Sequence, residues 1–170
     1  MRAGAAPVNP TSTAMATVHL TFPPDPAYVR TVRLVAAAEA RRAGVSDELL
    51  DEVRLAVGEA CTRAVALHRR HGLAEPIDMA MTDGGRFTVR VIDRGPAALA
   101  MNEPGETTGA IMAQVRAETG RMPVDEDAIM ANVGIALLNG LVSDLDVVAA
   151  AGGRGTEVRM SWPISRRSAH

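Results

Sequence analysis

The strongest constraint on the fold is a β-hairpin pattern at residues 76–93. Two segments, PIDMAMTD and RFTVRVID, flank the turn residues Gly84 and Gly85. In the second segment apolar and polar residues alternate, which indicates a strand with one buried and one exposed face. The Gly-Gly turn joins the two segments as antiparallel neighbours. Such a pair needs a second layer to cover its apolar face.

Two amphipathic helices are predicted before the hairpin. Residues 27–43 carry apolar side chains at helical spacing, and Gly44 supplies a C-terminal stop. Ser46, followed by acidic residues, is predicted to be the N-cap of a second helix over about residues 47–70.

Three further strand patterns and one short apolar helix complete the order of elements. The strands are predicted at residues 16–22, 144–150 and 156–162, and the helix at residues 132–142. Strands in runs, without strict alternation with helices, predict an α+β fold. We expect a two-layer sandwich of a mostly antiparallel sheet with helices on one face.

The 170 residues, 47% of them apolar, suffice for one domain, which we place at residues 16–163. Residues 1–15 are rich in Pro, Ala, Ser and Thr without periodicity and are predicted to be a disordered tail. A short C-terminal tail is expected at residues 164–170. Residues 94–130 carry three prolines and several glycines, and a segment of this length predicts a functional, lid-like loop.

Composition excludes several classes of function. The net charge is −2, and no basic stripe favours direct contact with nucleic acid. No apolar run approaches the roughly 18 residues of a membrane span, and the N-terminus has no continuous apolar region. Cys61 is the only cysteine, which excludes an internal disulfide and fits a reducing compartment. We therefore expect a cytoplasmic protein without membrane contact, in which Cys61 is a packing residue.

The second predicted helix carries Glu59 and Arg63 four residues apart, on the flank of an apolar stripe. An exposed pair at this spacing contributes only about 0.3–0.5 kcal/mol. The pair therefore either stiffens a surface helix or belongs to a site. His68 and His71 lie near the end of the helix, where positive charge favours its dipole. Neither has Cys or acidic partners at ligand spacing, so no metal site is expected.

Four short motifs occur in order along the chain: EACTR at 59–63, VIDRG at 91–95, NVGI at 132–135 and GTEVR at 155–159. Together they resemble the bacterial anti-sigma factor serine kinases, whose ATP-binding fold is shared with gyrase, Hsp90 and histidine kinases. The resemblance covers about residues 16–163. It is most specific in the helix DEVRLAVGEACTRAV and the strand exit VIDRGP.

The resemblance implies roles for particular residues. Glu59 matches the general-base glutamate of the family, and Asp93 matches the aspartate that hydrogen-bonds the adenine amino group. Gly95, Gly134 and Thr156 match further nucleotide-binding positions.

Three residues depart from the family pattern. Arg63 replaces an asparagine that helps to hold Mg²⁺, and Ala97 and Asn132 replace loop glycines. A guanidinium has only hydrogen-bond donors, so Arg63 cannot ligate the metal. Its alternatives at a nucleotide site are direct contact with a phosphate or pairing with Glu59, which would neutralise the base. The resemblance implies ATP and Mg²⁺ as cofactors, and these three departures weaken the inference that either one binds.

The implied function is that of an anti-sigma factor. Such a protein holds a sigma factor off RNA polymerase until an anti-anti-sigma antagonist competes, and in this family it phosphorylates a serine of that antagonist. A homodimer is also implied, and Tyr28, Arg30 and Arg33 are the expected partner contacts. Two alternatives stay open: a binding module of the same fold that has lost phosphoryl transfer, favoured by the three departures, and an unrelated α+β domain with a mobile acidic loop.

Overall fold

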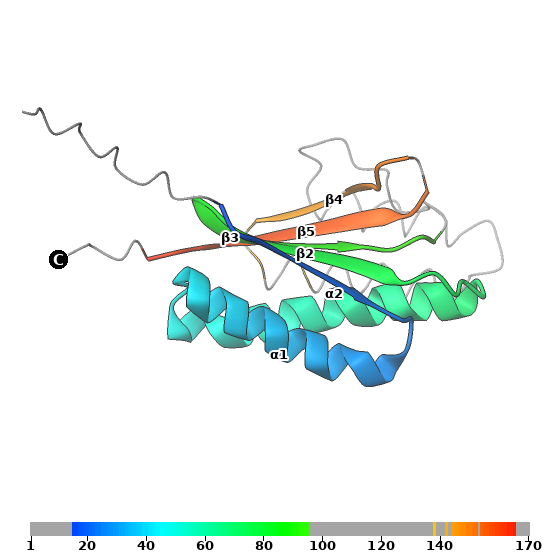
Figure 1. Ribbon diagram of the computed structural model, residues 1–170, viewed down its shortest axis with the longest axis horizontal. Coiled ribbons are helices and arrows are strands. Elements are labelled where there is room, and N and C mark those ends of the chain that lie inside the picture. The colour runs from blue at the N-terminus through cyan, green and yellow to red at the C-terminus, as the bar shows by residue number, and fades with distance from the viewer. Residues whose placement is uncertain (1–14, 96–137, 139–141, 143, 153, 166–170) are drawn as a thin grey trace, which may run out of the picture.

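The computed structural model describes residues 15–95, 138, 142, 144–152 and 154–165 (Figure 1). Several predictions lie outside these residues: the N-terminal tail up to residue 14, most of the loop at 94–130, and the positions of Ala97, Asn132 and Gly134.

The predicted hairpin forms the middle of an antiparallel sheet. β2 (Ile77–Asp83) pairs with β3 (Arg86–Ile92), with Met79 opposite Val91. β1 (Thr17–Phe22) pairs with the outer side of β2, and β5 (Thr156–Pro163) pairs with β3. β4 (Leu145–Ala149) lies beyond β5, so the strand order is β1-β2-β3-β5-β4 with every neighbouring pair antiparallel. All of the predicted strands are therefore confirmed.

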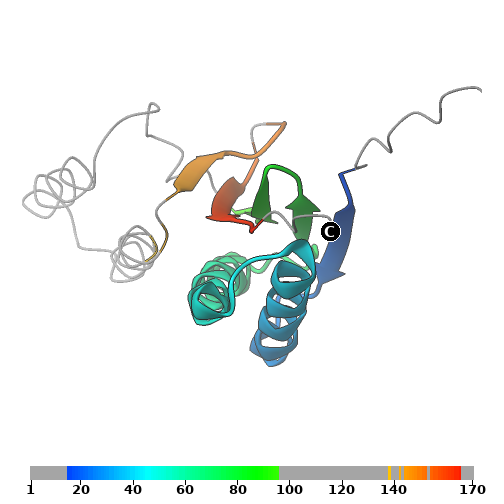
Figure 2. The ribbon, with the colours of Figure 1, turned by 90° about the vertical axis from the view of Figure 1, so that its left-hand side faces the viewer.

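Two helices lie side by side against one face of this sheet (Figures 1 and 2). α1 (Pro26–Ala43) begins where Oδ1 of Asp25 accepts a hydrogen bond from the N–H of Ala27 at 2.8 Å. It ends at Gly44, which has a left-handed φ of 97° that glycine adopts without steric cost. The predicted two-layer α+β sandwich is confirmed. Within the described ranges, no helix combines the length and apolarity that a membrane span requires.

The helical segment predicted at about residues 47–70 is confirmed, but it begins as a 3₁₀ turn with Ser46 at the N-cap position. A 3₁₀ turn at Asp47–Leu49 comes first, and α2 runs over Leu50–Arg70. The side chain of Ser46 makes no capping hydrogen bond. Its backbone carbonyl instead accepts the N–H of Leu49 at 3.0 Å, which closes the 3₁₀ turn.

The core fills the space between the helices and the sheet. Phe87, Val89 and Val91 of β3 are buried, whereas the residues between them are partly exposed, as the alternating pattern predicts. Trp162 on β5 packs near Phe87, with ring centroids 6.2 Å apart. Cys61 is fully buried, which confirms it as a packing residue, and burial raises the pKa of its thiol to about 12.

Candidate functional site

Three elements meet at Asp93, the residue directly after β3. α2 contributes Arg63, and β5 begins beside Asp93 with Thr156. The side chains of Asp93 and Arg63 are 1% and 4% exposed. Isolated charges at this depth are strongly destabilising, so the pair must be held by compensating interactions.

Both oxygens of the Asp93 carboxylate are bonded within the chain. Oδ2 accepts a hydrogen bond from Nη1 of Arg63 at 3.0 Å. Oδ1 accepts the backbone N–H groups of Gly95 at 3.0 Å and Thr156 at 3.1 Å. One cation and two amides thus compensate the buried negative charge, with the charge-assisted geometry that makes such bonds strong.

The position of Arg63 corrects two predictions. It is buried, not on the flank of the helix, and it pairs with Asp93 and not with Glu59. Glu59 is partly exposed, and no hydrogen bond or ion pair joins it to the described residues. The physical reason is that an exposed pair along a helix gains little, whereas a buried carboxylate needs a cation beside it. The role of Glu59 as general base stays a prediction.

A glycine allows β5 to start this close to Asp93. Gly155 has a φ of 95°, and a Cβ at this residue would lie 1.9 Å from the backbone oxygen of Asp93. At Gly95 a Cβ would lie 2.1 Å from Cδ2 of Leu67 on α2. Both glycines therefore permit a close approach at the site, which a side chain would obstruct.

His68, a buried histidine whose role the sequence analysis missed, links α2 to the residues that follow β3. Nε2 of His68 accepts the backbone N–H of Arg94 at 2.8 Å, so this nitrogen carries no proton. Nδ1 carries the proton and donates it in a hydrogen bond to the carbonyl of Glu75 at 3.1 Å. The sequence analysis placed His68 near the helix end, where positive charge favours the helix dipole. In the structure its ring instead links α2 to the exit of β3. The available signal was its spacing from Cys61 and Ala64, which places it on the buried face of the helix.

This corner does not fit adenine as it stands. The resemblance assigns the adenine amino group to Asp93, but Oδ2 of this residue already accepts the guanidinium of Arg63, and the Asp93 side chain is 1% exposed. Two buried atoms of residues in this cluster, Nε of Arg63 and Oγ1 of Thr156, have no hydrogen-bond partner among the described residues. Arg63 also cannot serve as a ligand for Mg²⁺, which takes oxygen ligands. Among the described residues, no group of three or more His, Cys, Asp or Glu side chains could hold a metal ion.

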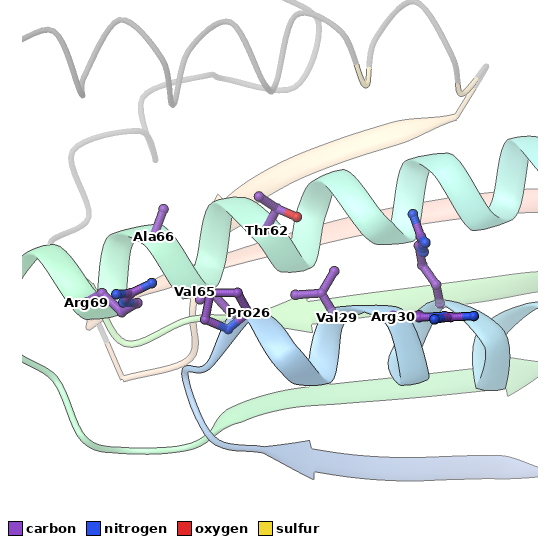
Figure 3. A pocket seen from close by; sticks show the side chains of 8 residues that line it. Pro26, Val29, Arg30, Thr62, Val65, Ala66 and Arg69 are labelled. Carbon is purple, nitrogen blue, oxygen red and sulfur yellow. The ribbon is translucent and has the colours of Figure 1, made fainter.

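A second feature is a groove between α1 and α2 with a volume of about 360 Å³ (Figure 3). Its apolar residues come from both helices, and three arginines also line it. Arg69 lies at one end of the groove and Arg30 toward the other, with Val29 and Val65 between them (Figure 3). The lining residues are Pro26, Val29, Arg30, Arg33, Thr62, Val65, Ala66 and Arg69.

The groove contains two of the three predicted partner residues. Arg30 and Arg33 are exposed and line it, and Tyr28 on the same helix is 45% exposed. Gly58 of α2 leaves room for Arg33, since a Cβ there would lie 2.7 Å from Cδ of Arg33. The stem of Arg33 therefore crosses α2 at this glycine.

The fold is an α+β domain with two helices on one face of an antiparallel sheet and a buried aspartate at the exit of β3. The family model of the histidine kinase-like ATPase domain matches residues 22–162, which include α1, α2 and the Asp93 cluster. The chain therefore belongs to the histidine kinase-like ATPase domain family. No curated protein matches the chain. The match confirms the expected superfamily. It does not distinguish anti-sigma factors from other members of that superfamily.

Proposed function

We propose that this protein is an anti-sigma factor that sequesters a sigma factor and releases it when an anti-anti-sigma antagonist competes. Membership of the ATPase domain family supports the fold that this role requires. The order and spacing of the four sequence motifs favour the anti-sigma branch. The observation that carries the proposal is the groove between α1 and α2, which three arginines line. Arg30 and Arg33 lie on α1, where the resemblance implies partner contacts.

The arginines of the groove differ from the other exposed arginines of the two helices. Outside the groove, the guanidinium groups have partners within the chain: Arg41 with Asp47, Arg42 with Glu39, Arg54 with Asp51, and Arg70, which also makes an interaction. In the described part of the chain, no hydrogen bond or ion pair holds the guanidinium groups of Arg30, Arg33 and Arg69. These three donors are free to bind an external acid.

The arrangement of charge favours a polypeptide segment as the ligand. Arg69 and Arg30 lie toward opposite ends of the groove, which favours a ligand that extends along it (Figure 3). Val29 and Val65 lie between them and offer an apolar contact. The ligand that matches is a segment with acidic residues on both sides of an apolar one. Arginine is enriched among the residues that dominate binding energy at interfaces.

A second candidate is the same binding role without phosphoryl transfer. The buried pair of Arg63 and Asp93 favours it, because this pair occupies the carboxylate that the resemblance assigns to adenine. Sigma-factor sequestration through the groove does not require nucleotide. The third alternative, an unrelated α+β domain, is set aside by the family match.

The test is direct titration of the purified protein with each sigma factor encoded in the same genome. We expect one of them to bind with a Kd of about 1 µM or lower, typical of a specific complex. The double variant Arg30→Glu, Arg33→Glu should weaken this binding at least about 100-fold, because two attractive charges become repulsive. Arg41→Glu is the matched control, since Arg41 is exposed on the same helix outside the groove, and it should change the affinity less than about threefold.

Two further measurements complete the test. Gly58→Ala should weaken sigma-factor binding without unfolding the protein, because the new methyl group displaces the stem of Arg33. Sedimentation equilibrium should give a dimer, which the family resemblance implies. If no sigma factor of the genome binds, or if Arg41→Glu weakens binding as much as the double variant, the proposal is wrong.

A further inference from the structure

We propose that Arg63 is an internal competitor of adenine nucleotide: its guanidinium occupies the Asp93 carboxylate and must leave before an adenine amino group can bond there. The inference rests on the geometry of the buried pair and on the ATP-binding fold of the family. It does not depend on any sigma factor.

The first step of the argument concerns space at Asp93. An N–H donor must come within about 3 Å of a carboxylate oxygen. Oδ1 already accepts two backbone N–H groups, and Oδ2 accepts Nη1 of Arg63 at 3.0 Å, so one lone pair of Oδ2 is left beside the guanidinium. Because the side chain of Asp93 is 1% exposed, a second donor has no open approach while Arg63 stays.

The second step concerns the displaced guanidinium. Once it leaves Asp93, Arg63 is a buried cation without its anion, which is strongly unfavourable. Glu59 offers a new partner, since it lies one helical turn before Arg63, is partly exposed, and has no ion pair within the described residues. A pair with Glu59 would neutralise the expected general base. Arg63 therefore blocks the expected adenine contact while it is on Asp93, and would neutralise the expected base if it moved to Glu59.

The third step concerns two unsatisfied atoms. Nε of Arg63 and Oγ1 of Thr156 are buried and have no partner. Buried polar atoms are nearly always hydrogen-bonded. An unsatisfied guanidinium Nε also occurs at Arg90, which pairs with Glu157, so the more informative atom is the hydroxyl of Thr156. The unused hydroxyl of Thr156 adjoins Asp93 through the backbone N–H of the same residue. The corner thus keeps hydrogen-bonding capacity for a ligand that arrives when Arg63 departs.

The experiment compares the wild type with Arg63→Ala by calorimetric titration with ATP and with inorganic tripolyphosphate. Both titrations are done in EDTA, so that metal binding does not contribute. We expect ATP to bind Arg63→Ala at least about tenfold more tightly than the wild type, which corresponds to about 1.4 kcal/mol. Tripolyphosphate lacks the base and should change less than about threefold. Arg90→Ala is the matched control, since it removes a partly buried arginine paired with Glu157 on β5 and should leave ATP affinity unchanged.

Metal dependence supplies a second comparison. Asparagine offers an oxygen to Mg²⁺ where arginine does not, so Arg63→Asn should bind ATP more tightly with Mg²⁺ than in EDTA. Circular dichroism establishes that each variant is folded. If Arg63→Ala does not fold, Arg63→Met takes its place, because its side chain fills more of the buried volume and donates no hydrogen bond to Asp93.

The proposal can also be tested on the wild type alone. At saturating ATP, the NMR resonances of the Arg63 guanidinium should shift as the group leaves Asp93. Three results overturn the proposal: equal or weaker ATP binding by the folded Arg63 variants, an equal gain with tripolyphosphate, or an unchanged Arg63 resonance in ATP-saturated wild type. A failure to find a sigma factor leaves all of these measurements intact, so the two proposals fail separately.

Discussion

Gly155 and Gly152 form a matched pair that tests how tightly the chain closes at Asp93. Both glycines have positive φ angles, 95° and 96°, so an alanine is strained to a similar extent at either position. This strain is worth about 1–2 kcal/mol. The difference lies in the surroundings. A Cβ at Gly155 would lie 1.9 Å from the backbone oxygen of Asp93, whereas a Cβ at Gly152 meets nothing within 4 Å.

The contact at Gly155 is with backbone, which cannot swing aside as a flexible side chain does. Relief of the clash requires the start of β5 to move away from Asp93. Two hydrogen bonds join these segments: from the N–H of Thr156 to Oδ1 of Asp93 at 3.1 Å, and from the N–H of Asp93 to the carbonyl of Thr156 at 3.0 Å. Buried groups that lose such partners cost about 1–3 kcal/mol each. We therefore expect Gly155→Ala to lower the free energy of unfolding by about 3–8 kcal/mol and Gly152→Ala by about 1–2 kcal/mol.

Urea unfolding measures both losses. Trp162, the only tryptophan, is buried on β5, so its fluorescence reports on the strand that Gly155 begins. The midpoints convert to free energies through the slope of the transition, about 1–3 kcal/mol/M for a protein of this size. If the two variants lose the same stability within about 0.5 kcal/mol, the close approach at Asp93 is not what requires Gly155, and the reasoning is refuted.

Two further predictions concern buried groups of α2. The thiol of Cys61 should react with an aromatic disulfide reagent at pH 8 at least about 1000-fold more slowly in the native protein than in urea, because the thiolate is the reactive form and burial suppresses it. Since the folded pKa of Cys61 is raised from 9.0 to about 12, its contribution to stability is complete below pH 9 and is lost as the pH rises toward 12. A Cys61→Ala variant should not lose this part of its stability between pH 9 and pH 12. Rapid reaction of the thiol in the native protein would contradict the burial of Cys61. His68→Ala should lower the free energy of unfolding by about 2–4 kcal/mol because Arg94 and Glu75 lose their partner, whereas the exposed His71→Ala should cost less than about 0.5 kcal/mol. Thermal or urea unfolding measures both losses of stability. Similar losses for the two histidines would show that His68 does not stabilise the link between α2 and the exit of β3.

Much of the fold follows from local patterns in the sequence. The alternation in β3 and the Gly84-Gly85 turn place the hairpin, and Gly44 ends α1 as its sequence predicts. These features depend on backbone preference and on periodicity over a few residues, which a sequence displays directly. The exception is the side chain of Ser46, which makes no capping hydrogen bond because the helical segment begins as a 3₁₀ turn.

The sequence alone predicted the class of fold, and three of the residues that its motifs indicate, Asp93, Gly95 and Thr156, lie together. Only the tertiary structure decided the partner of Arg63. Glu59 is its neighbour along the helix, but Asp93 is 30 residues away in sequence and becomes its partner through the packing of α2 against the sheet. The strength of an ion pair depends on how far both groups are removed from water, and burial is a property of the whole fold. The same reason explains His68, whose two backbone partners meet its ring only when α2 packs beside the exit of β3.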